Sequence, residues 1–215
     1  MTGPHHRRAH ALVRGLYGIA DAAAAGGDPV SLAADLLAGG CRLVQVRCKD
    51  WSLDEQIRVT HEVIALARPL GAVVFANDHP EVALATGADG VHIGQLDGSV
   101  EAARAVVGPD ILIGQSTHSV EQARASTGDY VAFGPVFETT NLSRHKPVRG
   151  IERLAAVAEV VRVPLVAIGG IGPARIAAVR DAGAHAWAVI GAVAGAADRV
   201  AATQVLVSTR SVRQT

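Results

Sequence analysis

Short apolar runs alternate with longer Ala- and Leu-rich stretches along most of the chain. Eight such runs, bounded by polar or turn-forming residues, predict β-strands at residues 16–21, 42–49, 72–77, 90–93, 111–115, 130–133, 165–168 and 186–190. The stretches between them carry apolar residues at helical spacing and predict one helix each. Strands that alternate with helices form a parallel sheet, because every crossover helix returns the chain to the same end of the sheet.

Helix boundaries agree with this division. Proline or serine stands where helices should begin and glycine where they should end; these residues are Pro29, Ser52, Pro80 and Pro173, and Gly39, Gly87, Gly128 and Gly183. Eight units in 215 residues predict one α/β domain, a (β/α)8 TIM barrel over residues 14–207, with short loops because such barrels typically have about 250 residues. We expect residues 1–13 to form a loose N-terminal lead-in and residues 208–215 a polar tail.

Composition narrows the classes of partner. Lys and Arg together number 20, as do Asp and Glu, so no net field favours a nucleic acid or a membrane surface. Cys41 and Cys48 form no disulfide framework or zinc motif, which favours a reduced, cytoplasmic setting. No secretory leader and no apolar run of 18 residues stands out, so no membrane segment is expected. Charged ligands must therefore be bound by local groups.

Strand 42–49 carries the first candidate site. The two-residue period of a strand places Leu43, Gln45, Arg47 and Lys49 on one face. A charge that points into a barrel without a partner is strongly unfavourable, so Arg47 and Lys49 need a bound anion or a facing carboxylate. Two cations at the carboxyl end of one strand, where barrel active sites lie, favour the anion. An internal ion pair is the alternative.

Two carboxylates form the second candidate. Asp78 follows strand 72–77 and Asp97 follows strand 90–93, and neighbouring parallel strands deliver both to the rim beside Arg47 and Lys49. Mg²⁺ prefers one or two carboxylates together with substrate phosphates and water, so the pair predicts a magnesium site. The alternative is that each Asp caps the helix that follows it.

Glycine-rich turns after the last two strands predict a phosphate site. Gly169 and Gly170 follow strand 165–168, and Gly191 and Ala192 follow strand 186–190. Glycines let backbone N–H groups approach an anion closely, and the corresponding loops of such barrels often hold phosphate. A plain tight turn is the alternative.

Hydroxyl-bearing and histidine residues complete the candidates. Ser116 and Thr139 follow the fifth and sixth strands and could contact phosphate oxygens or a heterocycle. His118 suits either a general base or the start of a helix. His92 lies within an apolar strand and is typical of an interior histidine whose hydrogen bonds are satisfied.

As a set, these motifs resemble the thiamine-phosphate synthase family over nearly the whole chain, from Leu16 to Ala197. The matching segments, in chain order, are LYGIAD (16–21), QVRCK (45–49), ND (77–78), VHIGQLD (91–97), STHS (116–119), GPVF (134–137) and IGGI (168–171). Each segment alone is weak evidence, but seven in the same order are specific. The resemblance implies a barrel enzyme that joins a hydroxymethylpyrimidine diphosphate to a thiazole phosphate, releases pyrophosphate and uses Mg²⁺.

The resemblance also implies a role for each candidate residue. Asp78 and Asp97 would hold Mg²⁺; Arg47, Lys49 and Ser116 would bind the diphosphate and act in catalysis; Gln45 and Asn77 would hold the pyrimidine; Thr139, Gly169, Gly170, Gly191 and Ala192 would hold the thiazole phosphate; and Asn141 is a further expected substrate contact. The sequence leaves the oligomeric state open, including an assembly of identical copies.

One departure from the family pattern keeps alternatives open. Leu142 stands where the family has a lysine that binds pyrophosphate, and either Arg144 or Lys146 could replace that lysine. The same fold also includes a thiazole tautomerase, in which a residue matching His118 would be catalytic. A non-catalytic barrel that binds thiamine precursors is a third interpretation. The pair Asp78 and Asp97 favours the synthase, because the resemblance to the tautomerase does not include it.

Overall fold

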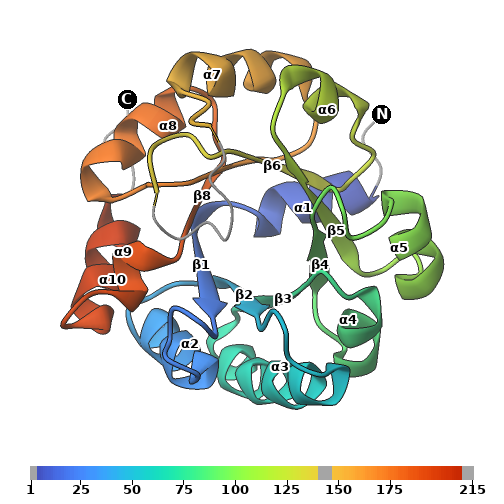
Figure 1. Cartoon of the computed structure of the whole chain (residues 1–215), viewed down its shortest axis with the longest axis vertical. Coiled ribbons are helices and arrows are strands. Elements are labelled where there is room, and N and C mark those ends of the chain that lie inside the picture. Colours follow the sequence, from blue (N-terminus) through green and yellow to red (C-terminus); the bar gives the residue numbers. More distant parts are fainter. Residues whose placement is uncertain (1–3, 140–146, 210–215) are drawn as a thin grey trace.

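A computed structural model describes residues 4–139 and 147–209 of the chain. Its centre is a closed barrel of eight parallel strands that neighbour one another in chain order (Figure 1). The strands are β1 (Gly15–Asp21), β2 (Leu43–Arg47), β3 (Val73–Asn77), β4 (Gly90–Ile93), β5 (Leu112–Thr117), β6 (Tyr130–Phe133), β7 (Leu165–Ile168) and β8 (Ala186–Val189). The predicted (β/α)8 barrel is confirmed.

Helices surround the barrel and connect its strands (Figure 1). They are α2 (Pro29–Ala38), α3 (Leu53–Ala67), α4 (Pro80–Thr86), α5 (Val100–Val107), α6 (Val120–Ala125), α7 (Ile151–Val160), α8 (Ile176–Asp181), α9 (Gly191–Ala194) and α10 (Arg199–Ser208), with short 3-10 turns η1 (Arg68–Leu70) and η2 (Pro173–Arg175). Ser52 caps α3 in a capping box with Glu55, as its position before the helix predicts. Within the described ranges, no helix combines the length and apolar character needed to cross a bilayer.

The N-terminal segment differs from the expectation of a loose lead-in, which is wrong for its described part. Residues Pro4–Leu12 form a helix, α1, which lies across one end of the barrel (Figure 1). Ala9 and Val13 are fully buried and belong to the same apolar cluster as the inward-pointing side chains of the strands. Arg8 donates a hydrogen bond to the Asp110 carbonyl group at this end. The segment is ordered because it closes the amino-terminal end of the barrel.

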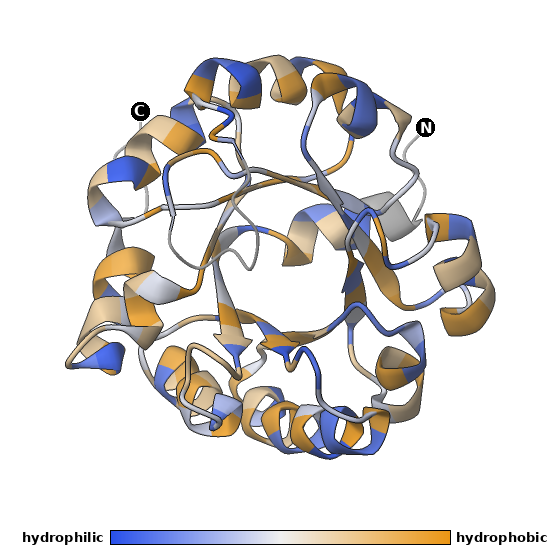
Figure 2. Ribbon diagram, in the orientation of Figure 1, coloured by the Kyte–Doolittle hydropathy of each residue, from blue (hydrophilic) through white to orange (hydrophobic). Residues whose placement is uncertain are grey.

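Two apolar layers follow from the alternation of side chains along each strand. Residues of one parity, such as Leu112 and Val166, point inward and fill the barrel. Residues of the other parity, such as Val44 and Val131, point outward and pack against the helices. The helices turn apolar residues such as Leu36 and Val63 toward the sheet, and apolar and polar residues alternate along them (Figure 2). Burial on both sides accounts for the continuous apolar strand sequences.

Two glycines make room for aromatic rings inside the barrel. A Cβ atom on Gly114 would lie 1.9 Å from Cζ of Tyr130, its register partner on β6. A Cβ atom on Gly90 would lie 2.1 Å from Cε1 of Phe75. These strand positions therefore lack a side chain because a neighbouring ring occupies its place. The rings of Tyr130, Phe75 and Tyr17 consequently meet edge to face, with centroids 5.6–6.2 Å apart.

Candidate functional site

Arg47 ends β2 at the carboxyl rim of the barrel, and it is paired with a carboxylate. Its guanidinium group donates to Asp21, its register partner on β1. Asp21 is only 4% exposed and also accepts from the backbone N–H of Ala24, at 2.9 Å. The internal ion pair that the sequence offered as an alternative is therefore present. The Arg47 side chain remains partly exposed, so it can also reach a ligand at the rim.

Lys49, Asp78 and Asp97 gather beside this pair. Lys49 Nζ lies 3.1 Å from Asp78 Oδ2. Asp97 accepts from the backbone N–H of Gly94, at 2.8 Å. Burial first, and then the neighbouring Asp78 carboxyl group, raise the pKa of Asp97. Two carboxyl groups and one cation thus share a small volume above β2, β3 and β4.

Neither aspartate caps a helix. His79 and Ser99 occupy the N-cap positions of α4 and α5, and the Ser99 hydroxyl group accepts from the α5 backbone. Asp78 has a left-handed backbone (φ 63°), which is uncommon outside glycine and places the residue between β3 and the helix. The capping interpretation is therefore wrong for both residues. Their carboxylates are available to a ligand.

The acidic pair fits a magnesium ion by its donor chemistry. Burial and the neighbouring Asp78 raise the pKa of Asp97, and a divalent cation would relieve the repulsion between two such adjacent carboxylates. No group of three or more His, Cys, Asp or Glu side chains suited to a metal ion occurs in residues 4–139 and 147–209. Mg²⁺ commonly uses one or two carboxylates and completes its coordination with phosphate oxygens and water.

Gln45 and Asn77 lie inside the barrel mouth, next to these charges. Both are buried, at 3% and 8% exposure. Gln45 pairs in register with Phe75, two residues before Asn77, so the two amide side chains point to the same interior. Gln45 donates from Nε2 to the Tyr17 hydroxyl group, at 3.0 Å. No local sequence pattern indicates this tyrosine contact.

Ser116 and His92 are joined on the other side of the interior. His92 Nε2 lies 2.9 Å from Ser116 Oγ, and His92 Nδ1 lies 2.9 Å from the Tyr130 hydroxyl group. Burial lowers the pKa of His92 to about 4, against a smaller opposing effect of Asp97. The interpretation of His92 as an interior histidine with satisfied hydrogen bonds is confirmed.

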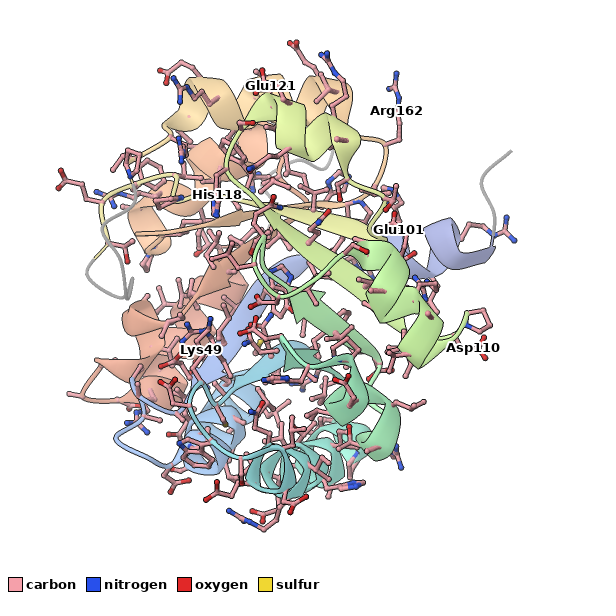
Figure 3. The ribbon with its side chains drawn as sticks, turned by 45° about the vertical axis from the view of Figure 1, so that its right-hand side comes forward. Lys49, Glu101, Asp110, His118, Glu121 and Arg162 are labelled. Carbon is pink, nitrogen blue, oxygen red and sulfur yellow. The ribbon has the colours of Figure 1, made fainter. Side chains whose placement is uncertain are left out.

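His118 follows β5 at the same rim as Lys49. Figure 3 shows both on one side of the molecule, with Asp110 toward the opposite end. His118 Nδ1 lies 2.7 Å from the carbonyl oxygen of Gly134, and the His118 backbone N–H donates to Gln122 in α6. His118 thus precedes α6 and connects the segments that follow β5 and β6, which agrees with the helix-start interpretation.

A cavity of about 1170 Å³ opens beside the last three strands. Its walls include the expected phosphate-site residues Thr139, Gly169, Gly170, Gly191 and Ala192. Gly170 has φ 63°, and a Cβ atom there would lie 2.2 Å from the carbonyl oxygen of Glu138. The turn therefore requires glycine for its backbone and for the close approach of the loop after β6. Asn141, Leu142, Arg144 and Lys146 lie outside the described residues.

Arg175 is a cavity residue that the sequence reasoning missed. Its guanidinium carbon lies 4.5 Å from the centre of the Phe137 ring, and Nη1 donates to the Gly170 carbonyl oxygen at 2.6 Å. A basic residue two positions after a proline that follows a glycine-rich turn was the available signal. Arg175 gives the cavity wall a positive charge that its glycines lack.

The rim therefore carries two groups of features. The cations and carboxylates belong to β1–β4, and a smaller hollow of about 320 Å³ lies beside Asp78 and Asp97. The larger cavity belongs to β6–β8. Such an arrangement can bind two anionic groups at once, one through side-chain charges and the other mainly through backbone N–H groups.

Comparison with known proteins gives consistent matches. The sequence profile of a family described as thiamine monophosphate synthase matches residues 16–193. A thiamine-phosphate synthase of Anaeromyxobacter dehalogenans is 44% identical over 195 residues, which cover 89% of this chain and 86% of that protein. A thiamine phosphate pyrophosphorylase of Pyrococcus furiosus has a similar solved structure, with a TM-score of 0.84, 33% identity and coverage of 94% and 96%. A 3-hexulose-6-phosphate synthase shares the fold, with a TM-score of 0.64, 23% identity and coverage of 92% and 100%.

Proposed function

The chain belongs to the thiamine monophosphate synthase family, and we propose that it joins a hydroxymethylpyrimidine diphosphate to a thiazole phosphate, forming thiamine phosphate and pyrophosphate. Its activity is that of a thiamine-phosphate synthase. The observation that carries the proposal is the gathering of Arg47, Lys49, Asp78 and Asp97 at one side of the rim, with the glycine-walled cavity at the other. A reaction between a diphosphate and a monophosphate needs two such anion sites.

Asp78 and Asp97 would hold the magnesium ion. Bound there, Mg²⁺ would neutralise charge on the diphosphate and so make it a better leaving group. Lys49 would exchange part of its contact with Asp78 for a contact with the diphosphate, because both partners are anionic and lie within reach of one ammonium group. Arg47, whose planar guanidinium group offers several donors, can bind phosphate oxygens while it keeps Asp21.

The remaining residues would hold the two rings and the second phosphate. Gln45 uses its amide N–H for Tyr17, which leaves the amide oxygen to accept from an amino group of the pyrimidine. Asn77 would bind a second edge atom of that ring. Thr139 and the backbone of Gly169, Gly170, Gly191 and Ala192 would hold the thiazole phosphate. Arg175 would add charge at the same cavity.

In the reaction, the bond between the pyrimidine methylene carbon and the diphosphate oxygen breaks first, and its electron pair leaves with pyrophosphate. The thiazole nitrogen then forms the new carbon–nitrogen bond. Catalysis therefore consists of stabilising the negative charge that develops on the departing group. Arg47, Lys49 and the Ser116 hydroxyl group would supply this stabilisation. The apolar interior beneath, closed by Tyr17, Phe75 and Tyr130, would keep water from the electron-poor carbon.

The setting of the enzyme remains part of the proposal. Both cysteines are buried and free, which agrees with a reducing compartment such as the cytoplasm. Small phosphorylated substrates are the expected partners. Identical copies of the chain are possible further partners, and the oligomeric state in solution is the quantity to measure.

The proposal is tested by incubating the full chain with both precursors and Mg²⁺ and measuring thiamine phosphate and pyrophosphate together. We expect the two products in equal amounts and their loss in excess chelator. Ser116→Ala, Lys49→Ala and Asp97→Asn should each lower kcat, while Arg58→Ala, an exchange on the outer face of α3, should not. Pyrophosphate without thiamine phosphate, or full activity in chelator, would contradict the proposal.

A further inference from the structure

We propose that His92 is a positioning residue, which carries its ring proton on Nε2 and thereby turns the hydroxyl hydrogen of Ser116 toward the diphosphate. The proposal rests on the proposed function for the identity of the anion. It goes beyond that function because it assigns a role to three buried residues, His92, Tyr130 and Tyr17, to which the proposed function gives no contact with substrate or metal. It also connects the pyrimidine site with the diphosphate site.

Five polar side chains form one continuous hydrogen-bond chain across the barrel interior. In order they are Gln45 on β2, Tyr17 on β1, Tyr130 on β6, His92 on β4 and Ser116 on β5. The four contacts measure 3.0 Å, 2.9 Å, 2.9 Å and 2.9 Å. Gln45, Tyr17, Tyr130 and His92 are at most 9% exposed, so water cannot substitute for a missing partner.

The first contact sets the direction of every later one. The Nε2 atom of Gln45 can only donate, so the Tyr17 oxygen accepts from it. Tyr17 has a single hydroxyl hydrogen, and the partner that the structure gives it is the Tyr130 oxygen. Tyr130 then donates its own hydroxyl hydrogen to His92 Nδ1. Any other arrangement leaves a buried hydroxyl hydrogen without an acceptor, which is unfavourable.

The tautomer of His92 follows from that direction. A ring nitrogen that accepts a hydrogen bond carries no proton, so an imidazole whose Nδ1 accepts is neutral and holds its single proton on the other nitrogen. Because Nδ1 accepts from Tyr130, that proton is on Nε2 and is donated to Ser116 Oγ. The oxygen of Ser116 is thereby occupied as an acceptor from within the barrel. Its hydrogen is left for a group at the rim, where a phosphate oxygen is a strong acceptor.

Packing holds the side chains of this hydrogen-bond chain in place. The Tyr130 ring stacks on His92, with centroids 5.5 Å apart, and lies in the space that Gly114 leaves open. Tyr17 and Phe75 contact the same ring edge to face. Rotation of the Tyr17, Tyr130 or His92 ring about its side-chain bonds would break two hydrogen bonds as well as this packing. The hydroxyl group of Ser116 is therefore oriented before the substrate binds, which is the condition for effective charge stabilisation.

The direct test is the protonation of the His92 ring nitrogens in the free protein, measured by nitrogen NMR on a chain labelled at histidine. We expect a single neutral form at pH 7.5, with a proton on Nε2 and none on Nδ1. A proton on Nδ1, or a charged ring, would overturn the proposal. This measurement needs no turnover, so it stands whether or not the parent protein makes thiamine phosphate. Failure of the proposed function would instead appear as absence of product from the parent protein.

Tyr130→Phe removes the hydroxyl group that fixes the tautomer and keeps the ring. We expect kcat to fall about 3–10-fold, the effect of one hydrogen bond, with less than about a twofold change in KM for the thiazole phosphate. In a Ser116→Ala background the same substitution should change kcat by less than about 1.5-fold, because its effect is exerted through Ser116. An equal loss in both backgrounds would show that Tyr130 is merely structural.

Two substitutions of His92 test whether the Nε2–H donor to Ser116 is required. Glutamine places an amide nitrogen near the position of Nε2 and can still donate to Ser116, whereas asparagine is one methylene group shorter. We expect His92→Gln to keep at least about threefold more kcat than His92→Asn, the effect of one retained hydrogen bond. Thr203→Val serves as the matched control, since it removes a buried, hydrogen-bonded hydroxyl group in α10, outside the barrel interior. Equal kcat in the two His92 variants would contradict the proposal.

Discussion

Lys49 Nζ lies 3.1 Å from Asp78 Oδ2, so this ammonium group is paired with one of the two carboxylates proposed as metal ligands. Asp97 stands next to this pair with a pKa raised by burial and by Asp78. Three ionisable groups thus share a place where only one cation opposes two carboxylates. A divalent ion would correct this imbalance, and the consequence can be measured without substrate.

Asp97→Asn should stabilise the metal-free protein and abolish its stabilisation by Mg²⁺. The folded pKa of Asp97 lies above the unfolded one, so repulsion grows as pH rises through that window and is fully present above it. At pH 8 without metal, we expect the variant to melt about 1–3 °C higher, because Asp97 is exposed and solvent limits its repulsion with Asp78 to less than about 1 kcal/mol. Thermal scans with and without Mg²⁺ provide the measurement, with Glu159→Gln on α7 as a charge-matched control. If Mg²⁺ leaves the melting temperature of the parent protein unchanged, the assignment of Asp78 and Asp97 as magnesium ligands is contradicted.

Arg47→Lys should weaken the diphosphate substrate selectively. Lysine keeps the positive charge that Asp21 needs, so the fold should persist, but it replaces a planar group with several donors by a single ammonium group. We expect KM for the pyrimidine diphosphate to rise about tenfold, the effect of losing one charge-assisted hydrogen bond, and KM for the thiazole phosphate to change less than about twofold. Steady-state kinetics with each substrate varied in turn measure the two KM values. Equal increases in both constants would mean that Arg47 acts only through the structure of the rim.

The low pKa of His92 predicts a specific acid sensitivity. In the folded state the pKa is about 4, whereas an unfolded histidine titrates near 6.5, so the unfolded chain takes up the proton first as pH falls. Stability from this residue is complete above about pH 6.5 and declines toward pH 4, by at most about 1.4 kcal/mol per pH unit. Urea unfolding of the parent and of His92→Gln at pH 7.5, 6 and 5 should show a steeper decline in the parent. Parallel declines would place the acid sensitivity elsewhere, for example at His185, whose pKa is also lowered by burial.

The sequence predicted the barrel well because its eight strands and the helices between them are specified locally. Apolar runs gave all eight strands, and Ser52 or Pro80 gave helix starts, since capping and the proline ring act within a few residues. Strand parity also placed Gln45 and Arg47 on the inward face. Contacts between distant strands could not be obtained in this way. The pairing of Arg47 with Asp21 depends on the register between β1 and β2, which no local pattern encodes.

The interior hydrogen bonds escaped prediction for a related reason. Tyr17 and Tyr130 are 113 positions apart in the chain, and the sequence around each indicates only an aromatic residue in an apolar strand. Their hydroxyl groups meet only because the barrel closes and Gly114 leaves space for a ring. The helix α1 was missed because residues 1–13 are mostly polar, and its short apolar spacing, Ala9, Leu12 and Val13, acquires its meaning only where it closes the barrel end.

The loop after β6 yields the last prediction, which concerns the leaving group. Leu142 stands where the family resemblance leads one to expect a lysine, and removing a charge-assisted contact to a developing anion typically lowers a rate by about one to two decades. Leu142, Arg144 and Lys146 lie outside the described residues, so kinetics must decide whether another cation compensates. Compensation from this loop predicts that Lys146→Ala or Arg144→Ala lowers kcat with the diphosphate substrate about tenfold, while Leu142→Lys adds little. Arg175→Ala is the informative comparison, because Arg175 lines the cavity proposed for the thiazole phosphate and should raise KM for that substrate instead. If Leu142→Lys alone raises kcat about tenfold and both alanine variants behave like the parent, the compensation hypothesis fails and the loop of this enzyme lacks a cation for the departing pyrophosphate.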